Sequence, residues 1–237
     1  MVDMNEVVAR IVRQRAVAPD RRSLLVGLSG IDASGKGFVA KQIEARLAQH
    51  SIAAANINVD GWLNLPERRF NSTRPAEHFY ENAIRFDELF AKLLLPLREQ
   101  RTVNLVANFI EETAKTYRQC TYSFKNVGVV LVEGIFLFKS EHRKLFDLAI
   151  WVDCSFPTAL SRALTRGQEG LSPAETIRAY ETIYFPAQKI HFDRDNPRET
   201  AHLTIDNDQT AAVAMAREGL ARRRPGIELR AAQYQRL

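Results

Sequence analysis

The segment Gly30-Ile31-Asp32-Ala33-Ser34-Gly35-Lys36 constrains the fold more than any other part of the chain, because it has the form of a phosphate-binding loop. An apolar run at 23–28 precedes it, and a segment with apolar side chains every four residues follows from about residue 36. A strand that turns through glycines into a helix aims backbone N–H groups and the helix N-terminus at one point, where the lysine reaches the outer phosphates. We therefore expect a nucleotide-binding α/β fold.

Strands and helices alternate along most of the chain. Apolar runs predict strands at 23–28, 53–59, 127–132, 148–152 and 203–205. Amphipathic segments predict helices at 4–17, 36–47, 87–98, 157–165, 173–184 and 210–223, with Pro96 interrupting the end of the third. The run at 127–132 is apolar on both faces, as is typical of a central parallel strand. We therefore expect an α/β three-layer sandwich around a mainly parallel central sheet.

Composition excludes several classes of protein. The chain has 237 residues, of which 46% are hydrophobic, so it can bury a core without disulfides or other cross-links. Two cysteines exclude a disulfide framework and favour a reducing compartment. No apolar run approaches the ~18 residues of a membrane span, and residues 1–20 lack the apolar centre of a signal peptide. We expect a cytoplasmic protein without a membrane partner.

The net charge of +5 suits an anionic small molecule. The most basic stretch, at 217–224, has no aromatic residues between its arginines, which favours a solvated helix end over a nucleic-acid surface. We therefore expect a small-molecule substrate and no nucleic-acid partner, and we leave a homodimer open.

The loop departs from its usual form after Lys36. Gly37 and Phe38 follow, where a Ser or Thr usually places a hydroxyl on Mg²⁺. The N–H of Gly37 can still contact phosphate, but metal binding must then rely on carboxylates and water. Asp60 and Glu133 each end a predicted strand, where open α/β sheets bind their ligands. Each is either a helix cap or surface charge, or a metal ligand or proton acceptor, and a pair beside a phosphate loop favours the second interpretation.

In this order the motifs resemble the uridine kinase and phosphoribulokinase family of P-loop small-molecule kinases. The matching segments lie at 30–36, 59–62, 86–89, 131–136, 151–153 and 161–166, and the similarity spans about residues 23–208. The phosphate loop is common to many families, whereas a strand ending in Glu133-Gly134 before an arginine-rich lid is more specific. The resemblance implies a P-loop kinase fold with a helical lid, and ATP and Mg²⁺ as cofactors.

The resemblance also implies a role for each matching residue. Asp60 would accept the proton of the substrate hydroxyl, and Glu133 would hold a metal or position water. Lys36 would neutralise the transferring phosphoryl group, and Arg162 and Arg166, on one helix face, would close on the phosphates. The expected ATP-binding residues are Gly30, Asp32, Ala33, Ser34, Gly35, Lys36, Gly37 and Phe38, and the expected substrate-binding residues are Asp60, Arg68, Arg69, Phe86, Asp87 and Glu133, with Asp60 and Glu133 as metal ligands.

The acceptor is less defined than the nucleotide. Uridine and cytidine kinases carry a Tyr-Asp-Phe and a downstream His that help to read the base, and the comparable stretch at 107–112 lacks the Tyr, the Asp and the His. Arg68, Arg69 and Arg74 either bind an anionic or aromatic substrate or belong to a surface loop.

We therefore expect an ATP-dependent kinase that phosphorylates a hydroxyl of a nucleoside or sugar-like metabolite. The alternatives are a nucleotide-binding protein with weak or no catalysis, because Gly37 replaces the loop hydroxyl, and a nucleoside monophosphate kinase. The absence of an Asn-Lys-x-Asp motif argues against a GTPase switch.

We expect one domain over 1–237. It would comprise an N-terminal helix (1–20), a core (21–156) with a substrate-binding segment at about 61–125, a lid region (157–200), and a final strand, helix and basic tail (201–237).

Overall fold

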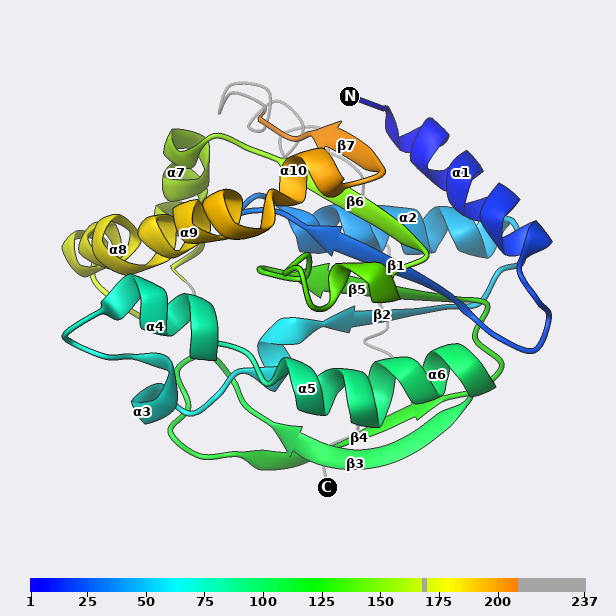
Figure 1. The fold of residues 1–237 in the computed structure, drawn as a ribbon, viewed down its shortest axis with the longest axis horizontal. Helices are drawn as coiled ribbons and strands as arrows, with labels where there is room; N and C mark the ends of the chain where they lie inside the picture. Colours follow the sequence, from blue (N-terminus) through cyan, green and yellow to red (C-terminus); the bar gives the residue numbers. More distant parts are fainter. Residues whose placement is uncertain (168–169, 209–237) are drawn as a thin grey trace, which may run out of the picture.

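The apolar runs that predicted strands all pair in one parallel sheet. This is seen in a computed structural model of the protein, which describes residues 1–167 and 170–208 (Figure 1). The strand order is β2-β5-β1-β6-β7, and every pairing is parallel. The strands are β1 (Leu24–Ser29), β2 (Ala54–Asn58), β5 (Val129–Gly134), β6 (Leu148–Asp153) and β7 (Leu203–Asp206). The predicted helix at 210–223 and the basic tail lie outside the described residues.

Helices cover both faces of the sheet, which confirms the predicted three-layer arrangement (Figure 1). Because successive strand residues point to opposite faces, Leu24 and Val26 of β1 belong to one buried cluster and Leu25 to the other. The first cluster includes apolar residues of α1 (Met4–Val17) and α2 (Lys36–Gln49). Within the described residues, no helix has the length and apolar composition needed to span a bilayer.

The second cluster, on the other face, includes residues of five helices and a two-stranded sheet. The helices are α4 (Pro75–Asn82), α5 (Phe86–Leu89), α6 (Leu95–Gln100), α7 (Phe156–Arg166) and α9 (Phe185–Asp195). Short helical segments complete the fold: η1 (Val59–Trp62), α3 (Pro66–Arg69), η3 (Arg143–Leu145), α8 (Pro173–Ala179) and α10 (Pro197–Thr200).

Two prolines lie within continuous helical segments. Pro96 lies in the first turn of α6, directly after the π turn η2 (Phe90–Leu94). Pro186 lies in the first turn of α9, directly after the π turn η4 (Tyr180–Tyr184). A proline clashes with the carbonyl four residues earlier, and the wider π turn relieves that clash. The helix predicted at 87–98 is thus interrupted by a π turn directly before Leu95 and Pro96, but it continues to Gln100, and the helix predicted at 173–184 continues to Asp195.

The two-stranded antiparallel sheet of β3 (Val103–Phe109) and β4 (Arg118–Phe124) was not predicted. It packs beneath the segment that follows β2, where a side chain at Gly61 would lie 2.6 Å from the ring of Phe109. The N–H of Ile110 donates to the carbonyl of Gly61 at 3.2 Å. The sheet therefore supports the residues immediately after Asp60.

Close packing at the end of β5 generates a stability prediction. A Cβ at Gly134 would lie 2.1 Å from Cγ2 of Val59, whose side chain is fully buried and β-branched. We expect Gly134→Ala to lower the free energy of unfolding by roughly 1–3 kcal/mol because it overpacks this contact. Urea unfolding measures the effect. The double variant with Val59→Ala should lose less than the sum of the single variants, and strict additivity would contradict the contact.

Candidate active site

The loop between β1 and α2 has the backbone of a phosphate cradle. Gly35 adopts φ +90° and Ala33 adopts φ +55°, which curls the chain before α2 begins at Lys36. A Cβ at Gly30 would lie 2.5 Å from the carbonyl oxygen of Val152, so only glycine fits between the loop and β6. Nζ of Lys36 donates to the carbonyl of Ile31 at 2.8 Å. The lysine therefore bends back over the loop.

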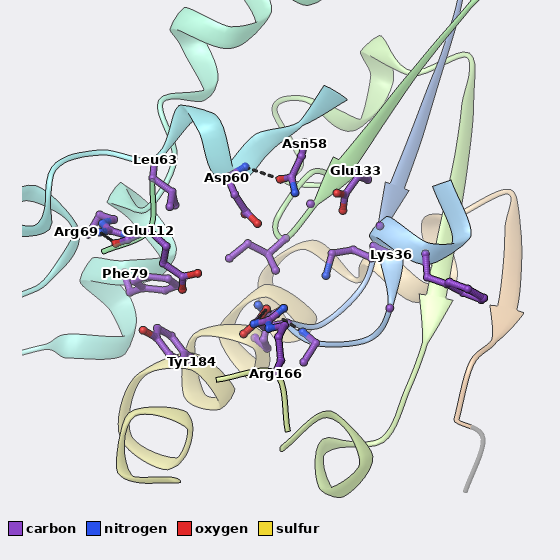
Figure 2. Close-up of a pocket in the computed structure, with 18 of the residues that line it drawn as sticks. Lys36, Asn58, Asp60, Leu63, Arg69, Phe79, Glu112, Glu133, Arg166 and Tyr184 are labelled. Carbon is purple, nitrogen blue, oxygen red and sulfur yellow. Dashed lines mark hydrogen bonds and ion pairs between the residues drawn. The ribbon is translucent and has the colours of Figure 1, made fainter. Parts of the chain in front are cut away.

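A cleft of about 400 Å³ opens beside Lys36 (Figure 2). It brings together most of the residues that the sequence proposed for nucleotide, substrate and metal. Ten of them line it: Asp32, Ala33, Gly35, Lys36, Gly37, Phe38, Asp60, Arg69, Glu133 and Arg166.

Asp60 and Glu133 face this cleft from neighbouring strand ends. Asp60 lies in η1, where its N–H donates to the Asn58 side chain at 2.6 Å. Burial raises the pKa of Glu133 to about 7, while Lys36 lowers it and Asp60 raises it. Burial also raises the pKa of Asp60, as does the Asp32 carboxylate, whereas Lys36 lowers it. Raised carboxyl pKa values in a cleft are typical of groups that exchange protons or bind cations.

Asp60 and Glu133 fit a divalent cation whose remaining ligands would come from bound phosphates and water. No group of three or more His, Cys, Asp or Glu side chains that could hold a metal occurs among residues 1–167 and 170–208. Mg²⁺ is usually held by one or two carboxylates, with phosphate oxygens and water completing its shell. A Cβ at Gly37 would lie 3.3 Å from Oε1 of Glu133, so this carboxylate reaches the position where the usual loop hydroxyl is missing. Asp60 and Glu133 therefore suit Mg²⁺ bound together with phosphates.

The two lid arginines, both on α7, have different surroundings. Arg162 donates to the carbonyls of Ser34, at 3.2 Å, and Asn207, at 2.7 Å, and it lies outside the cleft. Arg166 lines the cleft, with its Nη2 3.8 Å from Oδ1 of Asp32. The hydroxyl of Tyr180 donates to Asp32 from the other arm of the lid. The geometry thus ties Arg162 to the loop backbone and places Arg166 in the wall of the cleft beside Asp32.

Other predicted residues lie outside the cleft. Ser34 and Gly30, which belong to the loop, are buried and do not line the cleft. Phe86 is buried against Phe90 and the ring of His142, and Asp87 is exposed in the first turn of α5, where a carboxylate stabilises the helix dipole.

The three arginines that follow Asp60 also differ in whether they line the cleft. Arg68 and Arg74 are exposed, whereas Arg69 is buried and lines the cleft. Nη2 of Arg69 donates to the carbonyl of Glu112 at 2.8 Å, and burial lowers the pKa of its guanidinium.

Several cleft residues were not found from the sequence. They come from segments far apart in the chain: Lys41, Asn58, Leu63, Phe79, Glu112, Ile135, Tyr184 and Gln188. Figure 2 shows Phe79 and Tyr184 at the end of the cleft opposite Lys36, with Asp60 between the two ends. No local motif marks Phe79, Tyr184 and Gln188, because packing of α4 against η4 and α9 brings them to the cleft.

Comparison with known proteins finds a family model and individual proteins that are similar to this chain in sequence. The family model described as "Phosphoribulokinase / Uridine kinase family" matches residues 25–172. Uridine-cytidine kinase 2-B of Danio rerio is 30% identical over 179 residues, which cover 70% of this chain and 67% of that protein. Uridine kinase of Staphylococcus aureus is 25% identical over 170 residues, which cover 70% of this chain and 80% of that protein.

Solved structures share the fold at lower identity. A possible uridine kinase from Bacillus stearothermophilus superposes with a TM-score of 0.66 at 17% identity, covering 86% of this chain and all of that one. D-glycerate 3-kinase from Cryptococcus neoformans superposes with a TM-score of 0.58 at 10% identity, covering 86% of this chain and 94% of that one. Both have the arrangement of a P-loop kinase, as predicted for this chain.

The raised pKa of Glu133 predicts a pH dependence of stability without nucleotide or metal. Because its folded-state pKa of about 7 exceeds the ordinary 4.5, the folded state binds more protons between these values. The free energy of unfolding should therefore fall by up to about 3 kcal/mol as pH rises through this window. Glu133→Gln cannot ionise and should lack that fall.

Urea unfolding at about pH 5 and about pH 8 tests this difference. Glu67→Gln, at an exposed carboxylate of α3, is the matched control and should follow the unmodified protein. Parallel pH profiles for Glu133→Gln and the unmodified protein would contradict the assignment.

Proposed function

Because this chain belongs to the phosphoribulokinase and uridine kinase family and is a phosphotransferase acting on an alcohol group, we propose that it transfers the γ-phosphoryl group of ATP to a hydroxyl of a nucleoside or sugar-like metabolite. The supporting observation is the cleft itself. It joins a phosphate loop with its lysine, a carboxylate pair and a lid arginine at one end to an aromatic wall at the other. A bound hydroxyl beside Asp60 would lie between the two ends.

The triphosphate would bind at the loop, where the N–H groups that begin α2 and the ammonium of Lys36 offset its charge. Arg166 would exchange its contact with Asp32 for the phosphates. Mg²⁺, when bound, would offset charge on the phosphate oxygens, and Asp60 and Glu133 are the residues that would hold it. Catalysis of this kind depends on positioning and charge neutralisation more than on covalent chemistry.

Asp60 would accept the proton during transfer. The acceptor oxygen forms a bond to the γ-phosphorus while the bond from that phosphorus to the bridging oxygen breaks, and ADP carries away the electron pair. The hydroxyl proton passes to the Asp60 carboxylate. Burial of this carboxyl raises its pKa, which makes the ionised form a stronger base, while Lys36 lowers the pKa and so partly offsets the effect of burial.

A nucleoside monophosphate is the second candidate acceptor. The observation in its favour is Arg69, a buried guanidinium that lines the cleft and could pair with an acceptor phosphate.

The test is Mg²⁺-dependent ADP release from ATP with nucleosides, nucleoside monophosphates, sugars, sugar phosphates and pantothenate as acceptors. Turnover with a nucleoside or sugar supports the proposal, and turnover with monophosphates alone supports the second candidate. Bound ATP without ADP release from any acceptor would contradict both, and would support the alternative of a nucleotide-binding protein with little catalysis.

Two substitutions separate nucleotide binding from proton transfer. We expect Lys36→Ala to remove activity and weaken ATP binding, because the phosphates lose their main cation. Asp60→Asn should reduce kcat by roughly 10²–10⁴-fold with ATP affinity nearly intact, because the amide keeps an oxygen that can face Mg²⁺ but cannot accept the proton. Steady-state kinetics and calorimetric ATP binding measure these effects, and an unchanged kcat in Asp60→Asn would exclude Asp60 as the base.

Gly37 allows a test of metal binding. Gly37→Ser restores the hydroxyl next to Glu133, and we expect roughly 3- to 10-fold less Mg²⁺ to be needed for half-maximal ADP release. Gly37→Ala is the matched control, because it adds the Cβ without the hydroxyl. Equal Mg²⁺ requirements in the two variants would show that the metal lies away from residue 37.

A further inference from the structure

Gln188 is a buried side chain in the cleft with unfulfilled hydrogen-bonding capacity. It lies on α9, one helical turn after Tyr184, and only 1% of its surface is exposed. Neither Nε2 nor Oε1 has a hydrogen-bond partner in the described part of the chain. Burying an amide without hydrogen bonds is unfavourable, so such a group usually has a partner that is a ligand or an ordered water.

The surroundings of Gln188 indicate what kind of ligand would complete these bonds. Phe79 of α4 and Tyr184 have ring centroids 5.1 Å apart, and Phe70 stacks on Phe79 at 5.8 Å. Phe79 and Tyr184 form the end wall of the cleft on the far side of Asp60 from Lys36 (Figure 2). This end therefore combines flat apolar surfaces with an amide that offers one donor group and one acceptor side by side.

We propose that Gln188 is a specificity-determining residue of the acceptor site, where its amide forms paired hydrogen bonds with the edge of a nucleobase whose ring lies against Phe79 and Tyr184. This inference rests on the proposed function and names the part of the acceptor that is read. A nucleobase has a flat face and an edge with adjacent donor and acceptor atoms, whereas a sugar alone has no such planar edge. The stretch at 107–112 lacks the Tyr, Asp and His associated with base reading, and Gln188 supplies the missing hydrogen-bonding function from α9.

The competing explanation is a purely structural amide. Nε2 of His191, three residues further on α9, is also buried without a partner in the described part of the chain, while its Nδ1 lies 2.7 Å from Asp195. A water molecule joining Gln188 to His191 would satisfy both groups. In that case, changes at Gln188 would alter stability and leave acceptor recognition unchanged.

The deciding experiment measures acceptor binding directly. Uridine, cytidine and D-ribose are titrated calorimetrically into the full chain with Mg²⁺ and a non-hydrolysable ATP analogue. Gln188→Met keeps the length of the side chain but removes both hydrogen-bonding groups. Gln14→Met is the matched control, because Oε1 of Gln14 is likewise buried and unpartnered in the described part of the chain but lies on α1, which contributes no residue to the lining of the cleft.

We expect uridine or cytidine to bind more tightly than D-ribose. Gln188→Met should weaken nucleoside binding roughly 10- to 100-fold, because a base edge then faces an apolar side chain. Affinity for the ATP analogue and for D-ribose should not change, and Gln14→Met should behave as the unmodified protein. Should Gln188→Met fail to fold, Gln188→Leu replaces it; it also removes both hydrogen-bonding groups without adding a charge, and it should show the same selective loss.

Three results would overturn the inference: unchanged nucleoside affinity in the Gln188 variant, D-ribose binding as tightly as nucleosides, or no nucleoside binding at all. ADP release distinguishes failure here from failure of the proposed function. Release with sugars but not nucleosides overturns only the role of Gln188. Nucleoside binding through Gln188 without ADP release from any acceptor overturns only the proposed function.

Discussion

Parallel pairing of β5 with β1 and β2 is the interaction on which the site depends. The register sets Glu133 opposite Leu28, two residues before the phosphate loop begins, and opposite Asn58 on the other side, two residues before Asp60. Side chains alternate along a strand, so a slip of one residue would turn Glu133 to the opposite face of the sheet. The two carboxylates and the loop lysine therefore meet because three strands end together at one edge, as ligand sites of open α/β sheets do.

The charges gathered at this edge explain why the site suits phosphate chemistry. Lys36 and Glu133 are buried, and Asp32, Asp60 and Arg166 line the same cleft. Burial disfavours each charge singly, and the raised pKa values of Asp60 and Glu133 record that cost. Lys36 counteracts both shifts. A polyphosphate with its cation would bring charges of both signs, which Lys36 and the two carboxylates would offset.

The helical segment at 173–195 of the lid contacts both the phosphate loop and the wall of the cleft. The π turn at Tyr180–Tyr184 lets the helix continue through Pro186 instead of ending. As a result, Tyr180 contacts Asp32 of the loop while Tyr184 and Gln188 line the cleft. π turns occur frequently at functional sites, and here the turn connects the residue that contacts the phosphate loop to residues that line the cleft. Any movement of this segment would therefore change both the contact with the phosphate loop and the lining of the cleft.

The sequence by itself determined the strand, loop and helix around Lys36, the buried parallel strands, and the two carboxylates at the ends of β2 and β5. These features follow from short-range properties: apolar runs, glycines at a tight turn, and polar residues directly after strands. Only the tertiary structure decided that Arg69 lines the cleft while Arg68 and Arg74 are exposed, that Phe86 and Asp87 lie outside it, and that Phe79, Tyr184 and Gln188 complete it. The physical reason is that a side chain's direction in a short loop or at the end of a π turn depends on distant packing, here of α4 against α9 and of the β3–β4 sheet beneath Gly61.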